Sequence, residues 1–89
     1  MSVLDQAWAL APQVSVRPEP FGALLYHFGT RRLSFLKDRR LLAVVQGLGE
    51  APTARDACVD AGVGPGELRA YERALARLAE TDMLRERNG

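Results

Sequence analysis

The sequence predicts an α+β fold in which a three-stranded antiparallel sheet is followed by three helices. Between Val14 and Phe35 the apolar residues alternate with a period of two, which is typical of β-strands. After Lys37 the apolar residues recur every three or four positions, which is typical of amphipathic helices. Strands followed by helices, without regular alternation of the two, indicate an α+β domain.

The composition is that of one small globular domain. The chain has 89 residues, 47% of them hydrophobic, and a formal net charge of +1, which excludes a strong global field for collecting polyanions. We expect residues 1–13 to form a short arm that can be mobile, and residues 14–86 to form the domain. In the arm, Asp5–Ala11 could make a helical turn before Pro12; if the arm is ordered, Trp8 and Leu10 should anchor it.

A cytoplasmic location is expected. The chain has a single cysteine, Cys58, which cannot form an internal disulfide. The first residues of the chain lack the basic segment and the continuous apolar segment that are typical of a secretion signal. No apolar run approaches the roughly 20 residues that a membrane-spanning helix needs. Cys58 lies among alanines at helical spacing and is interpreted as a small buried side chain.

The first predicted strand contains Val14 and Val16, and it must be an edge strand because Pro18 and Pro20 cannot donate ladder hydrogen bonds. The turn between the second and third strands is placed at Gly29-Thr30, where glycine can adopt a positive φ. The alternation groups the large apolar side chains on one face, and it places His27 on the opposite, solvent-facing side. That apolar group is Val14, Val16, Leu24, Tyr26, Phe28, Leu33 and Phe35.

Three helices should follow, each with an identifiable first residue. Asp38 is a predicted N-cap for a helix over 39–46, and Thr53 for a second helix that runs to Ala61. Pro65 is typical of a helix start, and the third helix should end near Met83 and Leu84. The inward-facing residues are predicted to be Leu41, Leu42, Val45 and Leu48 in the first helix, and Leu68, Tyr71, Leu75 and Leu78 in the third.

The helical half also has the pattern of a helix-turn-helix, so a small winged-helix DNA-binding protein is an open alternative. In that interpretation the third helix would enter the major groove, with Arg69, Arg73 and Arg77 on the side away from the apolar stripe. Acidic residues are interleaved with these arginines, and a phosphate-binding surface would ordinarily show a clearer basic excess. A solvated outer face explains the mixed charges equally simply, and we do not expect nucleic acid as the partner.

No catalytic or metal-binding pattern is present. His27 is the only histidine, Ser34 has no neighbouring base, and no glycine-rich phosphate loop follows a strand. We therefore expect a protein that is not an enzyme and that carries no cofactor and no metal.

The third predicted strand is the most informative binding feature. As the other edge of the sheet, it exposes backbone groups to which an extended peptide can add as a further strand. Arg31, Arg32 and Lys37 flank it, and these cations either protect the edge from aggregation or attract an acidic peptide. The apolar stripe of the third helix has Ala70 and Ala74 on one flank and Ala76 and Ala79 on the other. Small residues on either flank would leave room for such a peptide, and ordinary helix packing also explains them.

Three stretches of the chain carry a specific resemblance to a known family. They are Pro12-Gln13-Val14, the run from Arg17 to Tyr26 and the run from Arg32 to Lys37. In residue types and order they resemble the mycofactocin biosynthesis chaperones of the PqqD-like precursor-peptide recognition family. From Asp38 to Leu84 the resemblance is one of pattern.

The resemblance implies a winged-helix domain that binds a ribosomally synthesised precursor peptide as an added strand and presents it to a radical S-adenosylmethionine maturase. Iron–sulfur clusters and the methyl-donor cofactor would then belong to the maturase, because this chain has no cysteine triad. A further possibility is an adaptor that binds the maturase and hardly touches the peptide. The implied peptide groove is formed by Arg32, Leu33, Ser34, Phe35, Leu36, Lys37, Leu68, Tyr71, Glu72 and Leu75.

Overall fold

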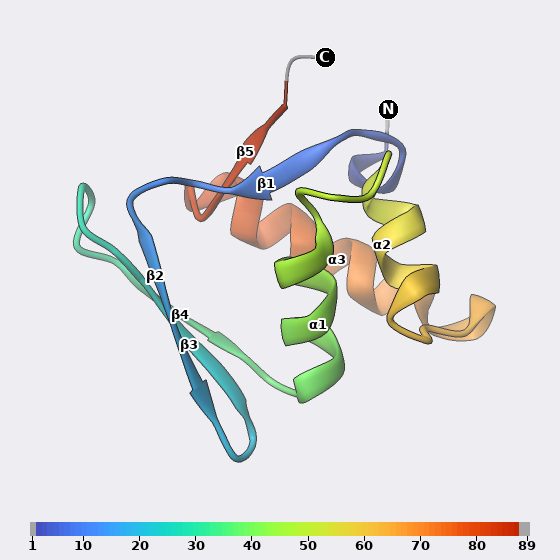
Figure 1. Cartoon of the computed structure of the whole chain (residues 1–89), viewed down its shortest axis with the longest axis horizontal. Coiled ribbons are helices and arrows are strands. Elements are labelled where there is room, and N and C mark those ends of the chain that lie inside the picture. Colours follow the sequence, from blue (N-terminus) through green and yellow to red (C-terminus); the bar gives the residue numbers. More distant parts are fainter. Residues whose placement is uncertain (1, 88–89) are drawn as a thin grey trace.

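The computed structural model describes residues 2–87 and confirms the α+β architecture (Figure 1). A three-stranded antiparallel sheet lies on one side of the molecule and three helices lie on the other. The strands are β1 (Trp8–Leu10), β2 (Val14–Glu19), β3 (Gly22–His27), β4 (Leu33–Leu36) and β5 (Leu84–Glu86). The helices are α1 (Arg39–Gly47), α2 (Ala54–Asp60) and α3 (Leu68–Glu80), with 3-10 turns η1 (Val3–Asp5) and η2 (Pro65–Glu67).

The larger sheet has the predicted order β2-β3-β4, so that β2 and β4 are its two edges. The connection between β2 and β3 is short, and Gly22 begins β3 in close contact with β4. A Cβ atom on Gly22 would lie 2.1 Å from the carbonyl oxygen of Leu36, so no larger residue fits without displacing the β4 backbone. This close approach fixes where β4 ends and α1 begins.

Helix α1 packs against the inner face of β3 and β4, and its start follows the predicted capping chemistry. The Asp38 carboxylate accepts a hydrogen bond from the Leu41 N–H at 2.7 Å, which satisfies a donor that the helix itself leaves unpaired. Thr53 caps α2 in the same way by accepting from the Asp56 N–H. The buried side chains of α1 are Leu41, Val44 and Val45, whereas Leu42 is only half-buried.

The predicted inner face was right for Val14 and Val16, which pack against the core, and wrong for the large apolar residues of β3 and β4. Ala23, Leu25 and His27 of β3 are buried against the helices, whereas Phe28 and Phe35 are 59% and 68% exposed. The inner face lies close to α1 and takes the small Ala23 and the compact Leu25, so the larger aromatic residues occupy the outer face.

His27 is therefore an inward residue with a structural role in the β3–β4 turn. It is 8% exposed, and its Nδ1 atom accepts hydrogen bonds from the backbone N–H groups of Gly29 and Thr30 at 3.0 and 3.1 Å. The turn lies at Gly29-Thr30 as predicted, but the positive φ belongs to Arg31, with a value of 61°, and not to Gly29. The imidazole satisfies the turn donors and thereby fixes the start of β4.

The N-terminal segment does not contain the helical turn expected within Asp5–Ala11. Trp8–Leu10 instead forms β1, which pairs antiparallel with β5, and Leu10 lies opposite Leu84. The expectation that α3 continues to Leu84 was likewise wrong: α3 ends at Glu80, and Asp82 has a φ of 64°, which turns the chain back toward β1. Trp8 and Leu10 pack against the core, but Leu4, 3% exposed, is the more deeply buried contact of this segment.

One core joins all of these elements. The side chains that are completely inaccessible include Leu25 and Leu36 from the sheet, Leu48 after α1, and Leu75 from α3. Helix α1 fills the inner face of β3 and β4, so α3 lies farther from the β4 edge than α1 does (Figure 1). A groove lies in the space between α3 and β4.

Candidate functional site

Strand β4 presents unused backbone groups along its open edge. The His27 N–H donates to the Arg32 carbonyl at 3.0 Å, and bonded pairs alternate along an antiparallel ladder. The pairs Leu25–Ser34 and Ala23–Leu36 therefore bond β3 to β4, while the N–H and C=O groups of Leu33 and Phe35 point away from β3. Since β4 is the last strand of its sheet, these groups face the open side.

The opposite edge of the sheet is less able to accept a strand. By the same alternation, Val14, Val16 and Pro18 hold the outward positions of β2. The Val14 N–H already donates to the Ala11 carbonyl at 3.0 Å, and Pro18 has no N–H to offer. An extended peptide would thus find a hydrogen-bonding edge at β4 and a mostly blocked one at β2.

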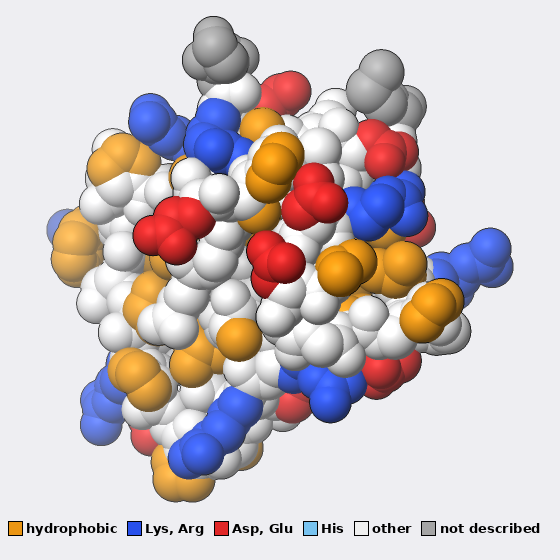
Figure 2. All heavy atoms as spheres, turned by 45° about the vertical axis from the view of Figure 1, so that its right-hand side comes forward, with side chains coloured by type: hydrophobic (Ala, Val, Ile, Leu, Met, Phe, Trp, Pro, Cys, Tyr) orange, Lys and Arg blue, Asp and Glu red, His pale blue; other side chains and the backbone are white. Residues whose placement is uncertain are grey.

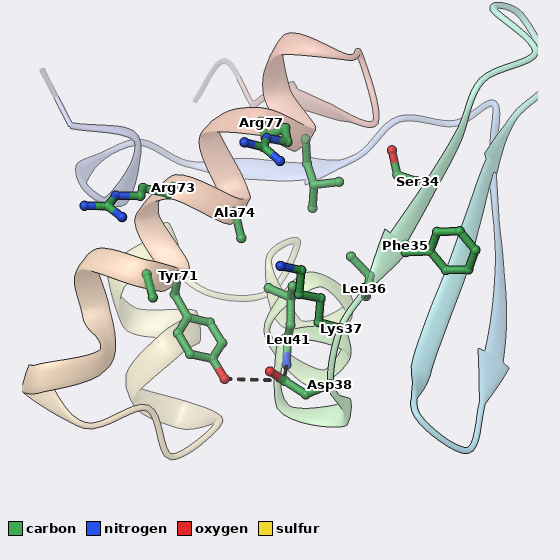
Figure 3. A pocket seen from close by; sticks show the side chains of 12 residues that line it. Ser34, Phe35, Leu36, Lys37, Asp38, Leu41, Tyr71, Arg73, Ala74 and Arg77 are labelled. Atoms are coloured by element: carbon green, nitrogen blue, oxygen red, sulfur yellow. Dashed lines mark hydrogen bonds between the residues drawn. The ribbon is translucent and has the colours of Figure 1, made fainter.

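A groove of about 600 Å³ runs between β4 and α3 (Figure 3). Ser34 and Leu36 form its strand side, and Ala70, Ala74 and Leu78 contribute the helix side. Because the alanine side chains are short, the groove stays open beside the β4 edge. Figure 3 shows the ring of Phe35 directed away from this space, on the other side of the strand.

Positive charge surrounds the groove. Lys37, Arg73 and Arg77 line it together with one carboxylate, Asp38. Asp38 is already engaged as the N-cap of α1 and as the acceptor for the Tyr71 hydroxyl at 3.4 Å. The ion pairs formed within residues 2–87 involve other side chains, namely Arg17 with Glu19, Arg40 with Glu67 and Arg55 with Asp5. The local field in the groove therefore favours an acidic ligand.

Tyr71 has its pKa raised above the ordinary value of 10.0, mainly because burial disfavours the phenolate. The neighbouring Asp38 carboxylate acts in the same direction. At neutral pH the groove floor therefore contains a neutral phenol that donates a hydrogen bond, and it does not contain a second anion that would repel an acidic peptide.

The structure brings together five of the ten residues that the sequence pointed to. Ser34, Phe35, Leu36, Lys37 and Tyr71 line the groove. Leu33 lies at the same edge and is 59% exposed, but on the outer face.

The other four predicted residues lie elsewhere. Leu75 is fully buried in the core, and Leu68 packs against that core. Glu72 accepts a hydrogen bond from the Ser2 hydroxyl, and Arg32 is an exposed residue whose carbonyl closes the β3–β4 turn.

Apart from Tyr71, the residues of α3 that line the groove were not among the ten predicted site residues. Arg73, Arg77, Ala70 and Ala74 belong to the flank of α3 that turns toward β4, whereas the apolar stripe through Leu75 faces the core. A signal was present in the sequence, since Ala70 and Ala74 are small and Arg73 and Arg77 are four residues apart. The pattern alone gave no reason to prefer this flank over the one that carries Ala76 and Ala79.

The surface around α2 shows no concentration of one charge. In Figure 2, which brings that side of the molecule forward, basic and acidic side chains are interspersed with separate apolar patches. Within residues 2–87, no helix is long and apolar enough to cross a bilayer, and no group of three or more His, Cys, Asp or Glu side chains could hold a metal ion.

The chain is similar to known peptide chaperones over most of its length. The model of the peptide chaperone MftB family matches residues 7–85. Peptide chaperone MftB of Mycobacterium tuberculosis is 60% identical over 80 residues, which cover 90% of this chain and 73% of that protein. The protein of the same name from Mycolicibacterium smegmatis is 54% identical over 80 residues, covering 90% of this chain and 78% of that protein.

No solved structure matches the chain significantly. The relatives are named as peptide chaperones, which favours peptide binding over the DNA-binding alternative. The family match extends from β1 through the helices into β5, and the alignment with the first of these relatives covers 90% of the chain. The chain therefore belongs to the peptide chaperone MftB family.

Proposed function

We propose that this protein is a non-catalytic peptide chaperone that binds the mycofactocin precursor peptide as a strand added to β4 and presents it to a radical S-adenosylmethionine maturase. The observation that carries the proposal is the open edge of β4, where the backbone groups of Leu33 and Phe35 point outward beside a groove of about 600 Å³. Strand addition uses such an edge for affinity and the adjacent pockets for specificity.

The groove chemistry supports an acidic segment of the precursor as the ligand. Lys37, Arg73 and Arg77 supply three positive charges around a largely apolar channel, and the one acidic residue that lines it is already hydrogen-bonded. A peptide with carboxylates near apolar side chains would match both features. Steering by these charges would also speed its association at low salt.

The short length of β4 is consistent with a presenting role. The strand has four residues, Leu33–Leu36, so an added strand would be held over a similarly short segment. The rest of the precursor would extend beyond the sheet and remain accessible to a second protein. In this function the chain supplies binding and orientation, and the cofactors and bond-changing chemistry belong to the maturase.

Substitution of Phe35 by proline tests the docking mode. Proline removes the outward N–H, and its ring disfavours close approach of a neighbouring strand. Because the same change also removes the phenyl ring, Phe35→Ser is the matched control that keeps the N–H. We expect Phe35→Pro to bind synthetic precursor at least about tenfold more weakly than Phe35→Ser, as measured by calorimetric titration.

Circular dichroism and urea unfolding of both variants must first show folded domains. Ser34 is unsuitable for this test, because its N–H belongs to the β3–β4 ladder and proline there would damage the domain itself. Equal precursor affinities for folded Phe35→Pro and Phe35→Ser would reject strand addition at β4.

The presenting role has a separate test. Purified maturase is supplied with precursor in the presence and absence of this chain, and product formation is followed by mass spectrometry. We expect modification to depend on the chain, and we expect no mass change in the precursor when the chain is present without the maturase. Modification at the same rate without the chain would reject the presenting role while leaving peptide binding intact.

A further inference from the structure

Over β3 and β4 the outer face of the larger sheet is apolar and is not covered by any described part of the chain, whereas β2 contributes the exposed Ser15 and Arg17 to this face. Phe21, Phe28, Leu33 and Phe35 are 52%, 59%, 59% and 68% exposed, respectively. Leu24 and Tyr26 lie between them on the same face and are half-buried. Contiguous exposed apolar surface of this kind marks an interaction site in most proteins.

The residues of this face are in register with one another and reach the open edge. Phe35 lies opposite Leu24, and Leu33 lies opposite Tyr26. The ring centroids of Phe21 and Phe35 are 6.1 Å apart, so these two rings pack at the end of the face next to the β4 edge. Leu33 and Phe35 therefore have two properties at once, outward backbone groups at the edge and apolar side chains on the outer face.

We infer that the outer apolar face is a second part of the peptide site and contacts every other side chain of the bound strand. It thereby selects a precursor segment with apolar side chains at two positions that are two residues apart. This inference depends on the proposed strand addition to β4. Its occupant is the peptide itself, because the residues that form the apolar edge, Leu33 and Phe35, are those whose backbone would bind the added strand.

The argument follows from strand geometry. Successive side chains of a strand point to opposite faces, and residues opposite each other on neighbouring strands share a face. Peptide residues opposite Leu33 and Phe35 must then lie on the outer face, within the range at which cross-strand side chains interact. The peptide residue between them points to the other side, into the groove near Ala74 and Arg73.

The two faces thus require different side chains from one segment. Outward positions meet an apolar surface, where a charged residue would lose hydration without gaining a partner. Inward positions meet a channel lined by cations, where acidic or small residues fit. The expected ligand alternates apolar residues with acidic or small ones, and a shift of the peptide by one residue would place every side chain on the wrong face.

Phe35→Ser tests the inference because it removes the ring and keeps the backbone edge. Val59→Ser is the matched control, since Val59 is 60% exposed but lies on α2. We expect Phe35→Ser to weaken binding of synthetic precursor about tenfold relative to the unsubstituted protein, and Val59→Ser to leave it unchanged. Serine substitution along the precursor should then identify two sensitive positions, two residues apart, whose effects are not additive with Phe35→Ser.

Three other results would overturn the inference. One is an unchanged precursor affinity in Phe35→Ser while Phe35→Pro still binds more weakly, which would leave the proposed function intact. Another is additivity between Phe35→Ser and every precursor substitution. The last is a dimer in sedimentation experiments that Phe35→Ser dissociates without changing precursor affinity, because the face would then bind a second copy of the chain.

Discussion

The Tyr71 hydroxyl donates a hydrogen bond to the Asp38 carboxylate, with an oxygen–oxygen distance of 3.4 Å across the floor of the groove. Asp38 lies two residues after the end of β4 and caps α1, whereas Tyr71 belongs to α3 (Figure 3). This one contact thus links the end of β4, the start of α1 and the α3 side of the groove. Because α3 does not pack closely on β4, this contact helps to set the width of the groove.

Alkaline pH should destabilise the protein through Tyr71. Its folded-state pKa is raised above 10.0 by burial and by Asp38, so the folded state retains a proton that the unfolded state loses. The corresponding stability is fully present below pH 10.0 and is lost as the pH rises through the folded-state pKa. Urea unfolding between pH 8 and 11 should show a smaller decline for Tyr71→Phe than for the unsubstituted protein; parallel declines would contradict this.

Gly22→Ala should disturb the end of β4. The added methyl group would lie 2.1 Å from the Leu36 carbonyl oxygen and 3.0 Å from the Asp38 nitrogen, so the backbone must shift. We expect a loss of about 1–3 kcal/mol in the free energy of unfolding, and weaker precursor binding. Gly47→Ala is the control, since nothing lies within 4 Å of its Cβ position. If the Gly22→Ala variant were as stable as Gly47→Ala, the close approach of the Gly22 and Leu36 backbones would not exclude a larger residue at position 22.

Removing the two arginines of the groove should weaken peptide binding and its dependence on salt. Arg73 and Arg77 line the groove, whereas Arg69, on the same helix, is exposed and does not line it. We expect Arg73→Gln with Arg77→Gln to lower precursor affinity about tenfold at low salt, and much less at 1 M salt, where charges are screened within about 3 Å. Arg69→Gln should bind normally; an equal effect there would indicate a nonspecific influence of net charge.

Cys58 should be unreactive in the native protein. Its side chain is completely buried, and burial raises the pKa of the thiol above 9.0, against a smaller opposite effect of Arg55. Because the thiolate is the reactive form, a chromogenic disulfide reagent at pH 8 should react far more slowly with the native chain than with the chain in denaturant. The single cysteine makes the signal unambiguous, and rapid reaction of the native protein would show an opening that exposes α2.

Local chemistry in the sequence was sufficient for several features. Asp38 and Thr53 fix helix starts because their side chains accept backbone hydrogen bonds within three residues. Pro18 identifies β2 as an edge strand because it has no N–H, and the order β2-β3-β4 follows from short connections. These features depend on neighbouring residues and need no knowledge of the rest of the fold.

From local sequence alone follow the three strands of the larger sheet, the N-caps of α1 and α2, and the position of β4 as an edge strand. Which surfaces these elements present depends on how they pack in three dimensions. In β3 both alternating sets are apolar, and only the packing of α1 shows that Ala23 and Leu25 are the inner set. The pairing of β1 with β5 joins the two ends of the chain, so no local pattern could indicate it. Which side of α3 lines the groove depends likewise on how this helix is rotated about its own axis relative to the core. Periodicity tells which residues share a face, and only packing between distant segments tells where that face points.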